Sequence, residues 1–288
     1  MPDIAGISGK AVADVAGMSG KSLSAIAKVN GITKAAQSGG SILTTNLVQH
    51  LDAGDSNSYG GTGTTWYDIS GNGGDVQFVN GPTYSSTEGG GSISFDGVND
   101  QGRIYSSDTS AIRPSETDLN NDGFTVQAWI KMDVDDSGVI WGNNMYSRRQ
   151  YYGLQVNFDN RTSTGGRIVM HKFDGDGNYA SYSRRSAVVA NIGTSSAWQF
   201  VTWRYDSASN TNWYGFINDT KYYLNTPSGT GSGLGYFASG DGNVATQKTS
   251  SYSYTDVQIA MILVYDAALT DTEVTDNYDA TKARFGHS

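Results

Sequence analysis

Apolar residues alternate with other residues along many short stretches of this chain. In residues 124–132 every second position is apolar, and Trp129 falls on the opposite face of the extended segment. A period of two predicts a strand with one face against a core. The residues on the core side of this segment are Phe124, Val126, Ala128, Ile130 and Met132. Further strand-like segments are residues 92–95, 102–106, 138–142, 151–158, 167–173, 179–183, 198–205, 211–217 and 257–265.

These segments follow one another without helices between them. That order predicts an all-β chain folded as a two-sheet antiparallel sandwich. The composition agrees, since the chain has 37 Gly, 18 Tyr and only 4 Pro, which is typical of short strands joined by tight turns. At 288 residues the chain is long enough to bury a sizeable core.

One helix is predicted near the end of the chain. Thr270 and Glu273 form a capping-box pattern, in which each residue satisfies a backbone amide of the other. Leu269 and Val274 are placed to pack across the start of this helix, and Val274 and Tyr278 share one of its faces.

The first 40 residues have a different pattern, built from three units of eleven residues that begin at Ile4, Val15 and Ile26. Two local structures fit a unit: a helical turn such as 23–29, or a strand such as 26–29 followed by an Asn-Gly turn. We favour the helical turn. A unit this short cannot bury its own apolar residues, so residues 1–40 are either a loose tail or an arm that docks or oligomerises, and we expect an arm. Its docking residues would be Ile4, Ile7, Val15, Met18, Ile26 and Val29. A Ser-Gly-Gly-Ser joint at 38–41 separates it from a second domain, residues 41–288.

Charge and composition narrow the function classes. The net charge of −9 argues against a nucleic-acid surface, because phosphate binding needs a cationic stripe. The chain has no cysteine, which excludes disulfides and thiolate chemistry. No apolar run reaches the length of a membrane span, and the first residues lack the pattern of a signal peptide. We therefore expect any export to follow another route, such as release of an assembled particle by lysis.

Five stretches in order resemble the laminin-G-like branch of the concanavalin-A-like lectin/glucanase jelly rolls. They are residues 66–75 ("WYDISGNGGD"), 92–100, 124–133, 198–206 and 256–278, spread along residues 45–286. The resemblance implies a jelly-roll sandwich. The sequence departs from the family at Asn218-Asp219, where an Asn-Gly turn is usual, and this puts the local hairpin in doubt.

The repeats at the front resemble short repeats in structural proteins of tailed bacteriophages. That resemblance implies a virion protein, either a capsid decoration or head fibre or a tail-fibre component. Such a protein would be made in the host cytoplasm, its arm would dock on other virion proteins, and its jelly roll would project from the particle surface. Adhesion to host cell-surface polysaccharide and assembly as a trimer are also compatible with it.

Catalytic residues are not expected. Glucanases of this superfold resemble one another in carrying two Glu on one strand face, because retaining hydrolysis needs two carboxylates about 5–5.5 Å apart. Here Glu88, Glu116 and Glu273 are the only glutamates, and no predicted strand carries two of them. The sequence therefore favours a protein that is not an enzyme, and a polysaccharide-degrading enzyme is the least favoured alternative.

Calcium is the one cofactor to consider. Asp174, Asp176 and Asn178 stand at alternate positions like the start of a calcium loop, but Tyr179 and Arg185 exclude an EF-hand. A hairpin turn explains the same residues. The family resemblance implies calcium at a sheet rim, and Asp96 and Asp100 would be the ligands there.

A contact surface for carbohydrate or protein is predicted around residues 141–152. Aromatic rings that stack on sugars, flanked by Asn and Arg, are typical of glycan sites. Tyr and Arg are equally typical of protein interfaces, so both kinds of partner stay open. The candidate residues are Trp141, Asn143, Asn144, Tyr146, Arg148, Arg149, Tyr151, Tyr182 and Arg184.

Overall fold

The computed structural model describes residues 40–105, 123–133, 137–147, 150–159, 166–174, 182–189, 197–206, 213–224, 226–228, 242–248 and 252–288. The compact unit to which they belong extends from Gly40 to Ser288. The predicted docking residues of the arm, together with Arg148, Arg149 and Asp176, lie outside the described residues.

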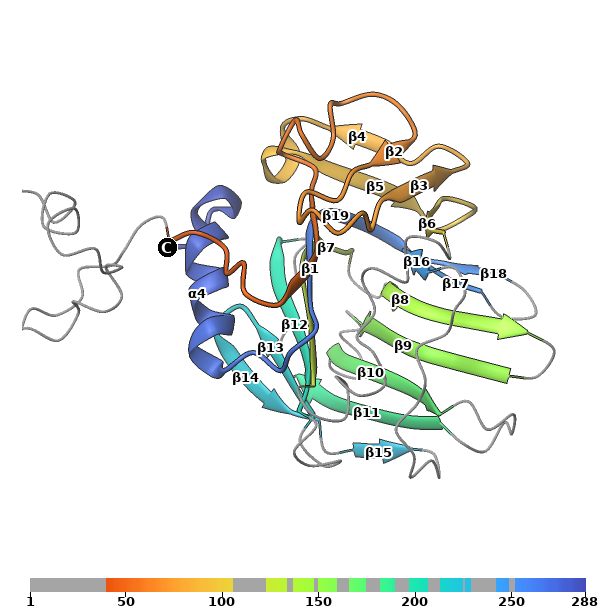
Figure 1. Cartoon of the computed structure of the whole chain (residues 1–288), viewed down its shortest axis with the longest axis vertical. Helices are drawn as coiled ribbons and strands as arrows, with labels where there is room; N and C mark the ends of the chain where they lie inside the picture. The colour runs from red at the N-terminus through yellow and green to blue at the C-terminus, as the bar shows by residue number, and fades with distance from the viewer. Residues whose placement is uncertain are drawn as a thin grey trace, which may run out of the picture. The chain divides into compact units, whose positions relative to one another are not determined.

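Two antiparallel sheets form a β-sandwich, which confirms the predicted fold class (Figure 1). The eight-stranded sheet has the order β14-β13-β12-β7-β19-β5-β4, with β1 also paired to β19. Its strands are β1 Leu47–Asp52, β4 Thr83–Ser85, β5 Ser92–Asp96, β7 Phe124–Lys131, β12 Gln199–Tyr205, β13 Trp213–Ile217, β14 Thr220–Tyr223 and β19 Asp256–Tyr265.

The nine-stranded sheet has the order β15-β11-β10-β9-β8-β16-β6-β3-β2. Its strands are β2 Thr65–Trp66, β3 Val76–Val79, β6 Gln101–Ile104, β8 Ser137–Ser147, β9 Gln150–Asp159, β10 Gly166–Asp174, β11 Tyr182–Val189, β15 Thr226–Ser228 and β16 Gly242–Val244. A separate ribbon pairs β17 Thr246–Lys248 with β18 Tyr252–Tyr254, and the helical elements are η3 Glu88–Gly90, α4 Asp271–Thr281 and η4 Lys282–Phe285. None of the described helices is long and apolar enough to cross a membrane.

The main core lies between the two sheets, and β7 contributes to it as its alternation predicts. Phe124, Val126 and Ala128 are buried in this core, whereas Trp129 belongs to a second buried cluster on the other face of the same strand. One strand thus supplies both clusters, because its side chains alternate between the two faces of the eight-stranded sheet.

Helix α4 covers the outer face of the eight-stranded sheet and completes the second cluster. The predicted capping box is present: the Glu273 amide donates to Thr270 Oγ1 at 3.2 Å, and the Thr270 amide donates to Glu273 Oε2 at 2.7 Å. Beyond α4, the ring of Phe285 stacks on Trp129 with the centroids 3.9 Å apart.

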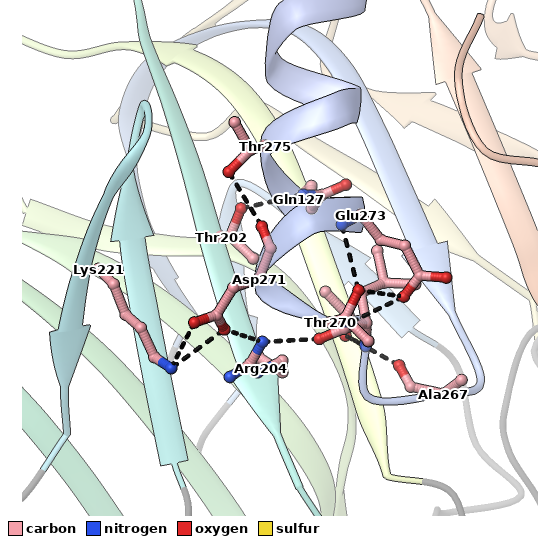
Figure 2. A network of polar contacts seen from close by, with 11 residues as sticks. Gln127, Thr202, Arg204, Lys221, Ala267, Thr270, Asp271, Glu273 and Thr275 are labelled. Carbon is pink, nitrogen blue, oxygen red and sulfur yellow. Dashed lines mark hydrogen bonds and ion pairs between the residues drawn. The ribbon is translucent and has the colours of Figure 1, made fainter. Parts of the chain in front are cut away.

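An ion-pair network ties the first turn of α4 to the sheet beneath it (Figure 2). Arg204 Nη1 lies 2.7 Å from Asp271 Oδ1, and Lys221 Nζ lies 2.8 Å from Asp271 Oδ2. Burial works to raise the pKa of Asp271, but the hydrogen bonds from Lys221 and Arg204 outweigh it and hold that pKa below its usual value. The helix therefore begins at a defined place on β12 and β14.

The chain that enters the sandwich from residue 40 runs along α4. The Leu43 amide donates to Asn277 Oδ1 at 2.8 Å, and the Leu43 carbonyl accepts from the Tyr265 hydroxyl at 2.9 Å. Asn277 Nδ2 in turn donates to Gln127 Oε1 and to the Tyr265 oxygen. A buried polar network thus fixes the entry of the chain on the helix side of the sandwich.

The hairpin that the sequence left in doubt is formed between β13 and β14. Ile217 pairs with Thr220, and Asn218 takes a left-handed φ of 57° at the first turn position. The Asn218 side chain also accepts from the Phe200 amide at 3.0 Å and donates to Gln199 at 2.9 Å. These bonds to β12 hold the turn without a glycine at its second position, since Asn tolerates the left-handed region.

Two of the predicted strands end well beyond the predicted positions. β8 continues five residues beyond the predicted end at Gly142, and β11 continues to Val189 although the prediction stopped at Ser183. Each extension begins with two polar residues, Asn143-Asn144 in β8 and Arg184-Arg185 in β11, which are paired with the neighbouring strands. Pairing between strands decides where they end.

Candidate functional site

One row of residues crosses the whole nine-stranded sheet, with one residue from each strand. Each member is the direct partner of the next in the strand register. Every member is polar or glycine. In the order of the strands from β2 to β15, this polar row is Thr65, Gln77, Arg103, Asn243, Gly142, Gln155, His171, Arg184 and Ser228.

The neighbouring row, one residue along the strands, is apolar over most of its length. Its members Phe78, Gly102, Val244, Trp141, Val156 and Met170 are also in direct register, and the large ones are in the main core. Cross-strand partners share a face of a sheet, and successive residues alternate between faces. The described members Thr65, Gln77 and Arg103 therefore belong to the face away from the core, and all three are half-buried.

The prediction that Trp141 offers its ring to a partner is wrong. Trp141 is 0% exposed, packs against Phe124 at 5.8 Å between ring centroids, and donates its Nε1 hydrogen to Gln49 Oε1 at 3.0 Å. The irregular register between Val139 and Trp141 sets which residues of β8 belong to the core row. Gly142, the next residue, falls in the polar row.

Three described members show how the polar row is built at one end. Thr65 and Gln77 bond to each other through their side chains, with Gln77 Nε2 donating to Thr65 Oγ1 at 2.9 Å. The guanidinium of Arg103 lies 4.9 Å from the ring centroid of Tyr105, which is 43% exposed. This arrangement offers an exposed aromatic ring and a cation side by side.

Asn243 is the unusual member of the polar row. Its side chain is almost completely buried, and its Nδ2 finds no hydrogen-bond partner within the described part of the chain. In register it lies between Arg103 and Gly142, which has no side chain. A buried donor without an acceptor costs about 1–3 kcal/mol, so this amide is a candidate for bonding a ligand oxygen.

Other candidate residues lie close to the polar row on the same strands. Asn144, Gly153, Phe173 and Tyr182 form a register line two residues along from it, and Arg184 belongs to the row itself. Tyr146 pairs with Tyr151 where β8 leads into β9, and Asn143 pairs with Leu154. The register thus brings residues from 143–151 and from 182–184 to one part of the sheet (Figure 1).

The calcium candidates are not gathered into a metal site by the described residues. Asp96 Oδ1 accepts from the amides of Val98, Asn99 and Asp100, the first of them at 2.9 Å. These hydrogen bonds lower the pKa of Asp96. The pKa of Asp100 is raised, mainly by burial and to a smaller extent by the charge of Asp96. Asp174 ends β10 of the nine-stranded sheet, whereas Asp96 ends β5 of the eight-stranded sheet. Nowhere in the described ranges do three Asp, Glu or His side chains come together as a metal would need.

The two described glutamates have structural partners. Glu88 lies 2.8 Å from Lys131 Nζ, and Glu273 caps α4. Asp68, in the stretch that resembles the opening loop of the family, accepts from the amides of His50, Ser70 and Gly74 and so holds that loop together.

Sequence reasoning missed most of the polar row. Single polar residues inside strands carry no local signal, and only the register shows that they align. The alternation in 76–79 and 101–104 is the one sequence signal that separates Gln77 and Arg103 from their buried neighbours.

No protein-family model matches the chain, and no curated protein matches it. Solved structures with the same fold do exist. The binding domain of botulinum neurotoxin DC, in complex with rat synaptotagmin II, matches at a TM-score of 0.57 and 12% identity over 83% of this chain and 52% of that chain. The same domain in complex with SialylT matches at 0.54 and 11% identity, with the same coverage.

A sialidase is also similar. The Trypanosoma rangeli enzyme in complex with sialic acid matches at a TM-score of 0.56 and 12% identity, over 90% of this chain and 36% of that chain. The chain thus spans about half the length of the neurotoxin-domain chains and about a third of the sialidase. At these identities the likeness shows the β-sandwich fold.

Proposed function

We propose that this protein is a carbohydrate-binding β-sandwich protein without enzymatic activity, and that the polar row is its contact surface. The observation that carries the proposal is the unbroken register of the row across all nine strands. Hydroxyl, amide and guanidinium groups in a line match the hydroxyl-rich edge of a sugar chain. Tyr146, Tyr151 and Tyr182 belong to strands of the same sheet, and tyrosine rings can stack on sugar rings.

The fold neighbours support the same class of ligand. Two of them were solved in complex with sialic acid and with SialylT, respectively.

We further propose that the protein is a structural component of a bacteriophage particle, with residues 1–40 docking on other virion proteins. Two features support this: the phage-like repeats, and the place where the chain enters the sandwich. A Cβ added at Gly40 would lie 3.9 Å from Ala280 of α4, so the entry is on the helix side. The polar row belongs to the other sheet, on the face away from the core.

Binding is tested with the full chain on a glycan array, comparing the natural protein with Asn243→Leu. Leucine fills the same space without the unpartnered donor, so the variant should unfold at the same or a higher denaturant concentration while its glycan signals weaken at least fivefold. Lys131→Gln, on the other sheet, is the control and should bind normally. An array without signals, or equal signals for Asn243→Leu, would contradict the proposal. Release of reducing sugar from a bound glycan would overturn its non-enzymatic part.

Docking is tested in particles with three charges placed on the apolar positions, in the triple variant Ile4→Asp, Val15→Asp, Ile26→Asp. We expect its incorporation to be lost. The matched control, Ser8→Asp, Ser19→Asp, Asn30→Asp, adds the same charge at polar positions of the same repeats and should be incorporated. Equal incorporation of both variants would remove the docking arm from the proposal.

A further inference from the structure

We infer that the ligand of the polar row is an acidic polysaccharide, a linear polymer carrying carboxylate or sulfate groups. The inference rests on the proposed function and adds the chemical class of the ligand. It is drawn from the distribution of charge over the two sheets, which the overall charge of the chain conceals.

The strands of the nine-stranded sheet are basic in a protein that is acidic as a whole. The chain carries a net charge of −9. Within the described strands of this sheet the basic residues are Arg103, Arg167, Lys172, Arg184 and Arg185, against Asp159 and Asp174. Arg103, Arg167 and Arg184 share the alternation of the polar row, as does Asp159, the strand partner of Arg167, whereas Lys172 and Arg185 fall in the alternate lines with Leu154 and Met170. The polar row itself holds two arginines and a histidine and no carboxylate.

The eight-stranded sheet shows no such excess. Its described strands carry Lys131, Arg204 and Lys221 against Asp52, Asp96 and Asp256. Each of those three cations lies within 2.8 Å of a carboxylate oxygen, of Glu88 for Lys131 and of Asp271 for the other two. The described strands of this sheet therefore carry as many acidic as basic residues.

The chemistry of the row fits an acidic polymer better than a neutral one. A guanidinium binds a carboxylate or sulfate through two parallel hydrogen bonds, which neutral sugars cannot accept from it with the same strength. The side-chain amide of Asn243 has a hydrogen to donate and no described acceptor, so it could donate a hydrogen bond to an oxygen of the ligand. Neighbouring strands are about 4.8 Å apart, so a row of nine strands is about 38 Å long, which suits a chain of several sugar units.

The test uses the purified full chain and a matched pair of polymers, dextran and dextran sulfate, with polygalacturonate as the carboxylate-bearing arm. Mobility in a native gel containing each polymer measures the affinity. We expect retardation by dextran sulfate or polygalacturonate and at least tenfold weaker retardation by dextran. The charged-polymer affinity should fall as NaCl is raised from 50 to 500 mM, since exposed charges are screened over a shorter distance. The two charged arms show which anion is preferred.

Two variants separate the row from the charge of the whole protein. Arg103→Gln should weaken retardation by the charged polymer at least threefold, whereas Lys221→Gln removes the same charge from the other sheet and should leave it unchanged. Equal loss in both variants would overturn the inference, as would binding to duplex DNA as tight as to the charged polymers. Retardation by dextran alone would overturn the acidic ligand and leave carbohydrate binding standing. No binding to any glycan would overturn the proposed function itself.

Discussion

Trp141 and Gln49 join the two sheets through the interior of the sandwich. The indole Nε1 of Trp141, in β8, donates to Gln49 Oε1, in β1, at 3.0 Å, and Gln49 Nε2 donates onward to the carbonyl of Gly74. Both side chains are 0% exposed. A buried polar contact of this kind requires every partner to be present, because the group left behind cannot bond to water.

The first prediction follows from this pair. Trp141→Phe keeps an aromatic ring but leaves Gln49 Oε1 without its donor, so we expect a loss of about 2–3 kcal/mol in the free energy of unfolding. Urea titration followed by fluorescence or circular dichroism measures it. Glycan binding below the unfolding transition should be unchanged, since the ring is in the core. A variant that is fully stable but has lost its glycan signals would show that Trp141 contacts ligand after all.

The polar network under α4 carries the second prediction. Asn277→Leu removes the acceptor of the partly buried Leu43 amide and the buried donor to Gln127. We expect a loss of about 2–4 kcal/mol in urea titration, because several partners become unsatisfied together. The control is Asp279→Asn, which removes only the exposed ion pair with Lys282 and should cost less than about 1 kcal/mol. Equal costs for the two variants would mean that the network is not what fixes the entry of the chain.

His50 makes stability depend on pH. Burial lowers the pKa of His50 below its usual 6.5, and this outweighs the nearby charges of Asp52, Asp68 and Asp55, which act to raise it. His50 therefore binds its proton at a higher pH in the unfolded chain than in the folded chain. As a result, the free energy of unfolding falls as the pH falls from 6.5 toward the folded pKa, and this loss is complete below the folded pKa.

The measurement is the free energy of unfolding at pH values between 7.5 and 4.5, for the natural protein and for His50→Gln. Glutamine has no proton to gain, so the variant should lose less stability than the natural protein over the upper part of this range. Parallel curves for the two proteins would show that another group sets the pH dependence there.

Alanine substitutions at two glycines with similar φ angles distinguish backbone strain from steric crowding of the added Cβ. Gly91 and Gly63 have φ of 126° and 101°, so alanine is strained at both. A Cβ at Gly91 would lie 2.5 Å from Gly54 Cα and 2.6 Å from the Ala53 carbonyl, whereas a Cβ at Gly63 meets nothing within 4 Å. We expect Gly91→Ala to cost about 3 kcal/mol or more and Gly63→Ala about 1 kcal/mol.

Thermal unfolding of the two variants side by side measures the difference. Gly91→Ala should also disturb Arg284, which donates to the Gly91 carbonyl and forms two bonds with Asp52. Similar midpoints for both variants would mean that the backbone around Gly91 moves aside at little cost.

Local patterns predicted much of the fold. The alternation in 124–132 correctly divided β7 between two buried clusters, and the Thr270–Glu273 spacing correctly located the start of α4. Each of these signals is carried by side chains within a few residues of one another. Strand ends in β8 and β11 were predicted less well, because pairing with neighbouring strands decides them.

The candidate site was harder to predict from the sequence than the fold. The stretch 141–152 was predicted as a contact surface for its Tyr, Asn and Arg residues, but Trp141 is buried in the core. A shift of one residue exchanges the two faces of a strand, and the irregular register after Val139 supplies such a shift.

The sequence by itself determined the class of the fold, the helix at its end and the acidic balance of the chain, because propensity, periodicity and charge are local or additive properties. Only the tertiary structure decided that nine residues, one from each of nine strands and drawn from positions 65 to 228, form one polar row. The row exists through strand register, which is set by hydrogen bonds between segments far apart in the chain. The same register placed Arg103, His171 and Arg184 in that row.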